Sequence, residues 1–130
     1  MSARAPAAGG TRGGGVAGSP ALNEEDVLRP AWPALPNVGA LMTTRRGGVS
    51  RAPWASLNLG SSVGDDAPAV AENRRRFAAS LRRAGSGAVA ARPVWLHQVH
   101  GTQVIELGVD TPGHVDTPAD AAWTRTPGIA

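Results

Sequence analysis

The sequence contains no cysteine, lysine or tyrosine, and aromatic residues make up only 4% of its 130 residues. Without cysteine, these residues form neither a disulfide framework nor a thiolate metal ligand or nucleophile. No apolar run approaches the roughly 18 residues of a membrane span, and the N-terminus lacks the apolar core of a secretion signal. We therefore expect a cytoplasmic protein with no membrane partner.

All the basic residues are arginine, which explains an isoelectric point near 11.3 at a net charge of only +3. Arginine, alanine, glycine and proline share GC-rich codons, so we attribute this usage to genome composition rather than to a polyanion partner. A small arginine-rich nucleic-acid-binding module is the alternative, and it requires basic side chains clustered on one face. The arginine-rich segment has no interleaved aromatic residues to stack on bases, so no nucleic-acid partner is expected.

The chain divides at about residue 30. Residues 1–30 are expected to be a disordered tail, because their alanine, glycine and arginine carry no apolar period. Residues 31–130 carry apolar segments separated by glycine and proline, enough for one small domain. The final Ile129-Ala130 opens another apolar segment, which indicates a truncated sequence. Strands are expected at 38–44, 93–96, 102–107 and 119–124, with loop at 108–118.

One helix is expected between Asp65 and Gly85. Asp65 or Asp66 can accept hydrogen bonds from the free amides of the first turn, and Pro68 suits that turn. Glycine at position 85 is a suitable C-terminal stop. Apolar residues recur at helical spacing in between, namely Val70, Phe77 and Leu81.

The three histidines, His97, His100 and His114, are the first candidates for chemistry. Imidazole is a good ligand for zinc or copper, but a competent site needs three protein ligands. The apolar neighbours of His97 and His100 favour strands, in which residues three apart point to opposite faces. Joint chelation by these two side chains is therefore not expected.

A second candidate is the glycine-rich segment from Thr43 to Ser50. Glycine lets the backbone approach a ligand closely, and arginine offers a planar fork to phosphate or carboxylate. The lysine and spacing of a phosphate-binding P-loop are absent. A β-turn with exposed arginines explains the segment equally well. The polar residues of Ser56–Gly60 can likewise pin their own loop as readily as bind a substrate.

Six short motifs follow one another along the chain: Thr44-Arg45-Arg46-Gly47-Gly48-Val49-Ser50, Ser56-Leu57-Asn58-Leu59-Gly60, Gly64-Asp65-Asp66, Glu72-Asn73-Arg74, Val94-Trp95-Leu96-His97-Gln98-Val99-His100-Gly101 and Ala119-Asp120-Ala121. Together they resemble the N-terminal half of the YfiH-like family, also called laccase-domain or polyphenol-oxidase-type proteins. Each motif alone is modest, but the ordered series is highly specific. The resemblance covers about Trp32 to Ala130.

The resemblance implies a layered α/β sandwich with mixed sheets and a cytoplasmic metalloenzyme of nucleoside metabolism. Family members are described as purine nucleoside phosphorylases that act on adenosine, inosine and methylthioadenosine, with adenosine deaminase activity also reported. The implied partners are purine nucleosides and phosphate. Copper-dependent polyphenol oxidation is the alternative activity, and it is disfavoured because a laccase relay needs many more histidines than the three present.

The family's metal is zinc, or copper in the older oxidase description, and it is held by two histidines and one cysteine. The first histidine lies in the Gln-Val-His-Gly motif, which corresponds to His100 here. The other two ligands lie in motifs downstream of Ala130. Family members usually have another residue in place of His97, so His97 is not assigned to the metal. The resemblance thus implies that the fragment alone is inactive.

Three substrate contacts are hypotheses from the loop chemistry, not motif assignments. Arg45 and Ser50 lie in the glycine-rich loop and suit phosphate or ribose, and Asn58 could orient either group. No residue is assigned to catalysis from the sequence.

Overall fold

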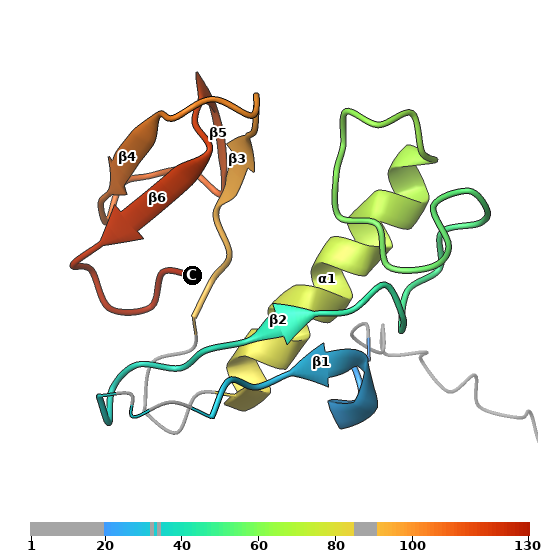
Figure 1. Cartoon of the computed structure of the whole chain (residues 1–130), viewed down its shortest axis with the longest axis horizontal. Coiled ribbons are helices and arrows are strands. Elements are labelled where there is room, and N and C mark those ends of the chain that lie inside the picture. The colour runs from blue at the N-terminus through green and yellow to red at the C-terminus, as the bar shows by residue number, and fades with distance from the viewer. Residues whose placement is uncertain (1–19, 32, 34, 85–90) are drawn as a thin grey trace, which may run out of the picture.

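The computed structural model describes residues 20–31, 33, 35–84 and 91–130 (Figure 1). A short 3-10 helix at Glu24–Asp26 precedes the first strand, and one α-helix, α1 (Ala67–Ala84), lies in the middle of the chain. The strands are β1 (Val27–Leu28), β2 (Met42–Thr43), β3 (Trp95–His97), β4 (Val104–Leu107), β5 (His114–Pro118) and β6 (Ala121–Thr124). None of the described helices is long and apolar enough to cross a bilayer.

The described strands form three two-stranded sheets of mixed direction. β1 pairs with β2 in antiparallel fashion, whereas β3 pairs with β5 and β4 pairs with β6 in parallel. Figure 1 shows β1 and β2 beside α1, with β3 to β6 grouped together. The combination of a helix with parallel and antiparallel strands confirms the predicted α/β class with mixed sheets.

The N-terminal segment contributes to the core. Leu22, Val27 and Leu57 form a buried cluster, and partly buried residues pack against it, namely Leu41, Leu59 and Phe77. The disordered tail predicted for residues 1–30 therefore does not describe residues 20–28, while residues 1–19 lie outside the described residues. Asp26, beside this cluster, is also buried, and its carboxylate accepts a hydrogen bond from Asn23 N at 3.3 Å.

The helix begins where the sequence predicts. Asp66 Oδ2 accepts a hydrogen bond from Ala69 N at 3.1 Å, and Asp66 O accepts one from Val70 N at 3.0 Å. The bond to the side chain satisfies an amide of the first turn that has no partner within the helix, and the bond to Asp66 O is the first backbone bond of the helix. Val70 is buried on the inner face. The predicted stop at Gly85 lies outside the described residues.

Two strand predictions need correction. The strand expected at 38–44 is reduced to β2, because Met42 and Thr43 are the residues that pair with β1. The loop expected at 108–118 contains β5. Its sequence has one apolar residue, Val115, and ends in proline, so its intrinsic strand signal is weak. Pairing with β3 overrides that weak preference, with Val115 opposite Leu96.

Asn73, in the middle of α1, connects the helix to the loops before it. Its side chain is fully buried, and its Oδ1 accepts a hydrogen bond from Val49 N at 2.8 Å. Its Nδ2 donates to Ser50 Oγ at 2.8 Å, to Asn58 O at 2.8 Å and to Ser56 O at 3.2 Å. One carboxamide therefore fixes two loop segments against the helix.

Gly48 makes this close approach possible. A Cβ at this position would lie 2.5 Å from Leu57 Cα and 2.6 Å from Asn73 Oδ1, and it would also overlap Ser56 O. Such distances exclude any side chain at position 48, so the glycine of the loop is required for packing.

Replacing Asn73 by alanine should lower the free energy of unfolding by about 3 kcal/mol, because buried backbone groups of two loops lose their partner. Urea unfolding followed by circular dichroism measures the change. Asn37→Ala is the matched control, since Asn37 is an exposed turn residue. Equal stability of Asn73→Ala and Asn37→Ala would contradict this role.

Candidate functional site

Ser50 and Asn58 meet at the carboxylate of Asp65. The Ser50 hydroxyl donates to Asp65 Oδ2 at 2.6 Å, and Asn58 Nδ2 donates to the same oxygen at 2.9 Å. Asn58 also closes its own loop, with Nδ2 donating to Gly60 O at 3.1 Å and Oδ1 accepting from Gly60 N at 3.0 Å. Ser50 is 5% exposed. Both side chains are thus already engaged in pinning the loop.

The same hydrogen bonds act on the ionisation of Asp65. The pKa of the Asp65 carboxyl is lowered below its usual value, most strongly by the hydrogen bond from Ser50 and next by the one from Asn58. Desolvation raises the pKa and opposes this only in part. Donors that bond the charged form stabilise it. The sequence suggested Asp65 only as a helix cap, and this role as an acceptor for two loop residues was missed.

Arg45 lies on the exposed side of these loops. Its Nε donates to Ala55 O at 2.8 Å, and its backbone oxygen accepts hydrogen bonds from Ser56 N and Leu57 N, each at 2.9 Å. The side chain is exposed to solvent. A guanidinium carries five N–H donors in a planar fork, so an arginine held in this way can still bind an anion.

His100 lies in the turn between β3 and β4. The residue is exposed, and its backbone is in the left-handed region with φ at 58°. The carboxylate of Asp120 accepts hydrogen bonds from the amides on both sides of it, Val99 N at 3.1 Å and Gly101 N at 2.8 Å. A left-handed conformation at a residue other than glycine is unusual and is often found at functional positions.

The histidines do not gather into a metal site. His97 ends β3, and His114 begins β5, where its Nε2 lies 3.2 Å from Asp116 Oδ1. Over the described ranges, no three or more His, Cys, Asp and Glu side chains are placed to hold a metal ion together. His100 offers one donor suited to zinc or copper, and three protein donors are needed. These residues alone therefore do not fit a complete metal centre.

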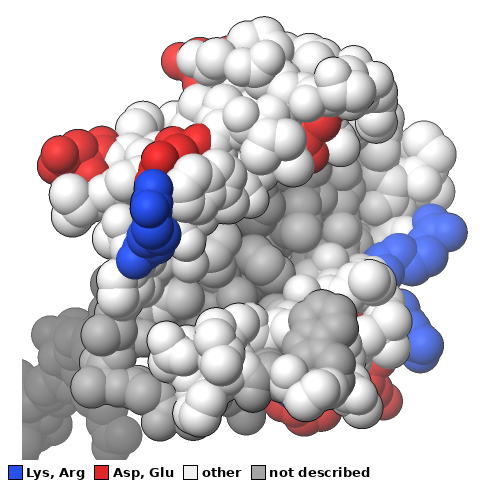
Figure 2. All heavy atoms as spheres, turned by 60° about the vertical axis from the view of Figure 1, so that its left-hand side comes forward, with Lys and Arg blue, Asp and Glu red and all other residues white. Residues whose placement is uncertain are grey.

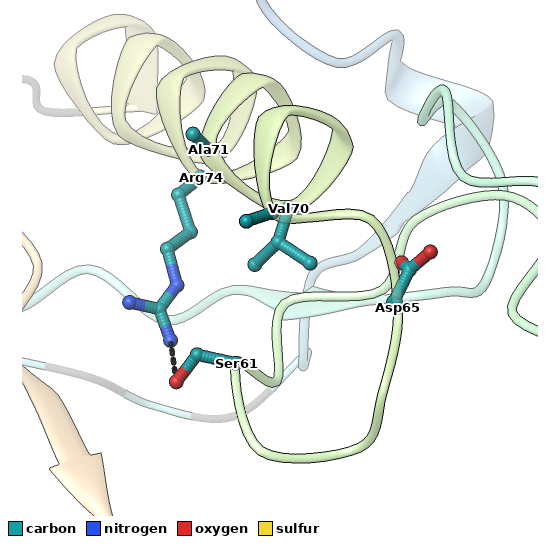
Figure 3. A pocket seen from close by; sticks show the side chains of 6 residues that line it. Ser61, Asp65, Val70, Ala71 and Arg74 are labelled. Atoms are coloured by element: carbon teal, nitrogen blue, oxygen red, sulfur yellow. Dashed lines mark hydrogen bonds between the residues drawn. The ribbon is translucent and has the colours of Figure 1, made fainter.

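A shallow pocket of ≈ 180 Å³ lies at the start of α1. Figure 3 shows Arg74 reaching from the helix to Ser61, whose Oγ lies 3.4 Å from Arg74 Nη2, with Val70 and Asp65 nearby. The volume is below the roughly 300 Å³ at which small-molecule pockets begin.

Arg74, on α1, packs against the Trp95 ring of β3. Its guanidinium carbon lies 4.4 Å from the centre of the Trp95 ring, and that ring lies 5.6 Å from the ring of Phe77. Partial burial lowers the pKa of Arg74, which nevertheless stays charged at neutral pH. These contacts join α1 to β3.

The arginines provide no single basic face in the view of Figure 2, where the blue side chains occupy two separated places with acidic groups between and beside them. Several arginines are paired with carboxylates, as in Arg29 with Glu24, Arg76 with Glu72 and Arg125 with Glu106. A nucleic-acid-binding module would need a clustered basic surface, so this view does not favour that alternative.

Most of the chain is similar to one described protein family and to proteins of several bacteria. Residues 39–130 match the family described as multi-copper polyphenol oxidoreductase laccase. A purine nucleoside phosphorylase of Pseudomonas aeruginosa is 50% identical over 103 residues, which cover 79% of this chain and 38% of that protein. The purine nucleoside phosphorylase YfiH of Escherichia coli is 42% identical over 102 residues, which cover 78% of this chain and 39% of that protein.

Among solved structures, YlmD of Geobacillus stearothermophilus superposes with a TM-score of 0.60 at 28% identity, over 87% of this chain and 43% of that chain. The chain thus spans less than half of the length of each of these relatives. The family match at residues 39–130 includes the Ser50–Asn58–Asp65 loops and the His100 turn.

The lowered pKa of Asp65 predicts a pH-dependent contribution to stability. In the unfolded chain the carboxyl titrates near about 3.9, so the contribution is complete above that pH and is lost as the pH falls through the lower value of the folded state. The difference in urea midpoint between the original protein and Asp65→Asn should therefore shrink below about pH 4.

Asp110→Asn is the matched control, because it removes an exposed carboxylate from a loop outside this network. A difference for Asp65→Asn that stays constant from neutral to acidic pH would show that the bonds of Ser50 and Asn58 do not depend on the charge of Asp65.

Because the described residues do not bring three protein ligands together, we predict that this chain on its own binds metal weakly. Zinc titration of the purified 130-residue chain, followed by calorimetry, should give no stoichiometric complex, and His100→Ala should change the result little. One equivalent of tightly bound zinc, lost in His100→Ala, would contradict this prediction.

Proposed function

The chain belongs to the multi-copper polyphenol oxidoreductase laccase family, and from this membership we propose that it forms part of a cytoplasmic purine nucleoside phosphorylase. The proposal rests on the curated relatives of the chain, which are named purine nucleoside phosphorylases. The substrates would be phosphate and adenosine, inosine or methylthioadenosine, and the products the free base and ribose 1-phosphate. Deamination of adenosine and the absence of a nucleic-acid partner stay predictions.

The chemistry of phosphorolysis defines what the protein must supply. A phosphate oxygen attacks C1′ of the ribose while the bond from C1′ to the purine nitrogen breaks. Positive charge develops on the sugar and negative charge on the departing base. Donors and cations held in place before the reaction stabilise such charges most effectively, and holding the phosphate beside the ribose reduces the entropic barrier.

Arg45 is the proposed phosphate contact. Its backbone is tied to Ser56 and Leu57, and one donor of its guanidinium is bonded to Ala55 O. These bonds limit how far the side chain can move, while its exposure leaves it accessible to a ligand. A planar guanidinium binds two oxygens of one phosphate at once.

Ser50 and Asn58 are proposed to support the substrate loop through Asp65. Their polar atoms bond to Asp65, Asn73 and Gly60 inside the loop network. The burial of Ser50 supports an indirect role in orienting phosphate or ribose rather than direct contact.

His100 is proposed as the ligand that this chain contributes to a zinc site, with copper as the alternative metal. Bound zinc would supply a Lewis acid for a water molecule or a substrate oxygen. The described residues contribute the exposed imidazole of His100 and the ordered turn that carries it.

The test is phosphate-dependent release of hypoxanthine from inosine by the complete gene product, followed by chromatography. Arg45→Ala should raise the KM for phosphate about tenfold or more, because a charge-assisted contact to phosphate is lost. Arg51→Ala is the matched control, since Arg51 is an exposed arginine on a neighbouring loop.

Base release that does not depend on phosphate would overturn the proposed function. An equal rise in KM for Arg51→Ala would show that general positive charge, rather than Arg45, attracts the phosphate. Phenol oxidation without phosphorolysis would instead favour the laccase activity that the family's description names.

A further inference from the structure

The exposed turn between β3 and β4 is held by one short segment far along the chain. Ala119 N donates to His97 O at 3.0 Å, where the turn begins, and Asp120 N donates to Gln103 O at 2.9 Å, where it ends. Between these points the Asp120 carboxylate accepts the amides of Val99 and Gly101. Residues 119 and 120 thus satisfy backbone groups at the start, centre and end of the turn.

The two carboxylate bonds flank His100. Oδ1 accepts from the residue before it and Oδ2 from the residue after it, at 3.1 and 2.8 Å. Drawing both amides toward one carboxylate folds the backbone around residue 100, whose φ of 58° is unfavourable for most residues other than glycine. Bonds to an ionised acceptor are stronger than neutral ones, so they can offset that cost.

The neighbours of the carboxylate are suited to this contact. Ala119 is fully buried, which fixes the backbone from which Asp120 extends. β6 begins directly after Asp120 and pairs with β4, with Ala121 opposite Val104. At Gly101, a Cβ would lie 3.2 Å from Asp120 Oδ2, so a larger residue there would press against the carboxylate.

We propose that Asp120 is a positioning residue for His100, which fixes the backbone of an exposed imidazole so that its ring is presented in one direction. The functional consequence rests on the proposed function, in which His100 works at the active site. The structural consequence does not, because it concerns only the turn. In catalysis the placement of such a group matters, since a displacement of about 1 Å from the reactive geometry can cost about 100-fold in rate.

The turn itself is tested in the 130-residue chain by nuclear magnetic resonance. In Asp120→Ala, the amides of Val99 and Gly101 should exchange with solvent about tenfold faster, and the His100 ring should lose its preferred orientation in side-chain couplings and proton contacts. Asp120→Asn keeps one carbonyl acceptor and should give an intermediate result. Asp110→Asn should match the original protein. Unchanged exchange and ring orientation in Asp120→Ala would overturn the proposal.

The catalytic consequence is tested in the complete gene product. Per folded molecule, Asp120→Ala should lower kcat about tenfold or more and change the KM for nucleoside by less than about twofold, with partial recovery in Asp120→Asn. A purely structural role would lower only the folded fraction, so a normal kcat for the folded Asp120→Ala protein would overturn the positioning role. If the original protein shows no phosphorolysis, the proposed function fails, and the resonance experiment alone decides the proposal.

Discussion

The burial of one carboxamide, that of Asn73, is the constraint on which the first part of the structure depends. Among the described residues the buried apolar side chains are three leucines, two valines and one alanine, and four polar residues are buried beside them, namely Asp26, Ser50, Asn73 and Ser80. Buried polar groups are costly unless each finds a partner, and among the described residues no buried side-chain nitrogen or oxygen is left without one. The loops before α1 are therefore held by a satisfied polar network as much as by apolar packing.

This dependence decides what the loop residues are free to do. Ser50 and Asn58 cannot leave the network without breaking bonds to Asp65, and Ser50 would also lose its bond to Asn73. Arg45 is different, because its backbone and Nε are anchored while its side chain remains exposed. A rigid support that presents one exposed, charged group is an arrangement suited to binding an anion. In these loops Ser50 and Asn58 therefore support the backbone, whereas the exposed side chain of Arg45 is accessible to a ligand.

The sequence predicted those parts that depend on local signals. α1 was found because Asp66, Pro68 and Val70 act within one turn of the helix start. β5 and the packing of Leu22 and Val27 were missed, because both depend on partners distant along the chain. For the site, sequence reasoning named the loop and His100 but left open whether the polar residues of Ser56–Gly60 pin their own loop or bind a substrate. Asn58 does bond within this loop, and a substrate contact stays a proposal. The contact of Asp120 with the His100 turn could be found only in three dimensions.

The two candidate regions share one physical design. In each, a polar side chain from a later segment bonds to the backbone of a loop. Asn73 accepts a hydrogen bond from Val49 N of the glycine-rich loop and donates to Ser56 O and Asn58 O. Asp120 accepts hydrogen bonds from Val99 N and Gly101 N of the His100 turn. This explains why separate motifs must occur together, since Glu72-Asn73-Arg74 supplies the partner of Thr44–Ser50, and Ala119-Asp120-Ala121 supplies the partner of Gln98–Gly101. Without its partner, either loop would lose these hydrogen bonds to its backbone. Without its loop, the side chain of Asn73 or Asp120 would lose the same bonds. The motifs that occur in order along the sequence therefore supply the residues of two hydrogen-bond networks. These networks hold the backbone of the loops that carry Arg45 and His100.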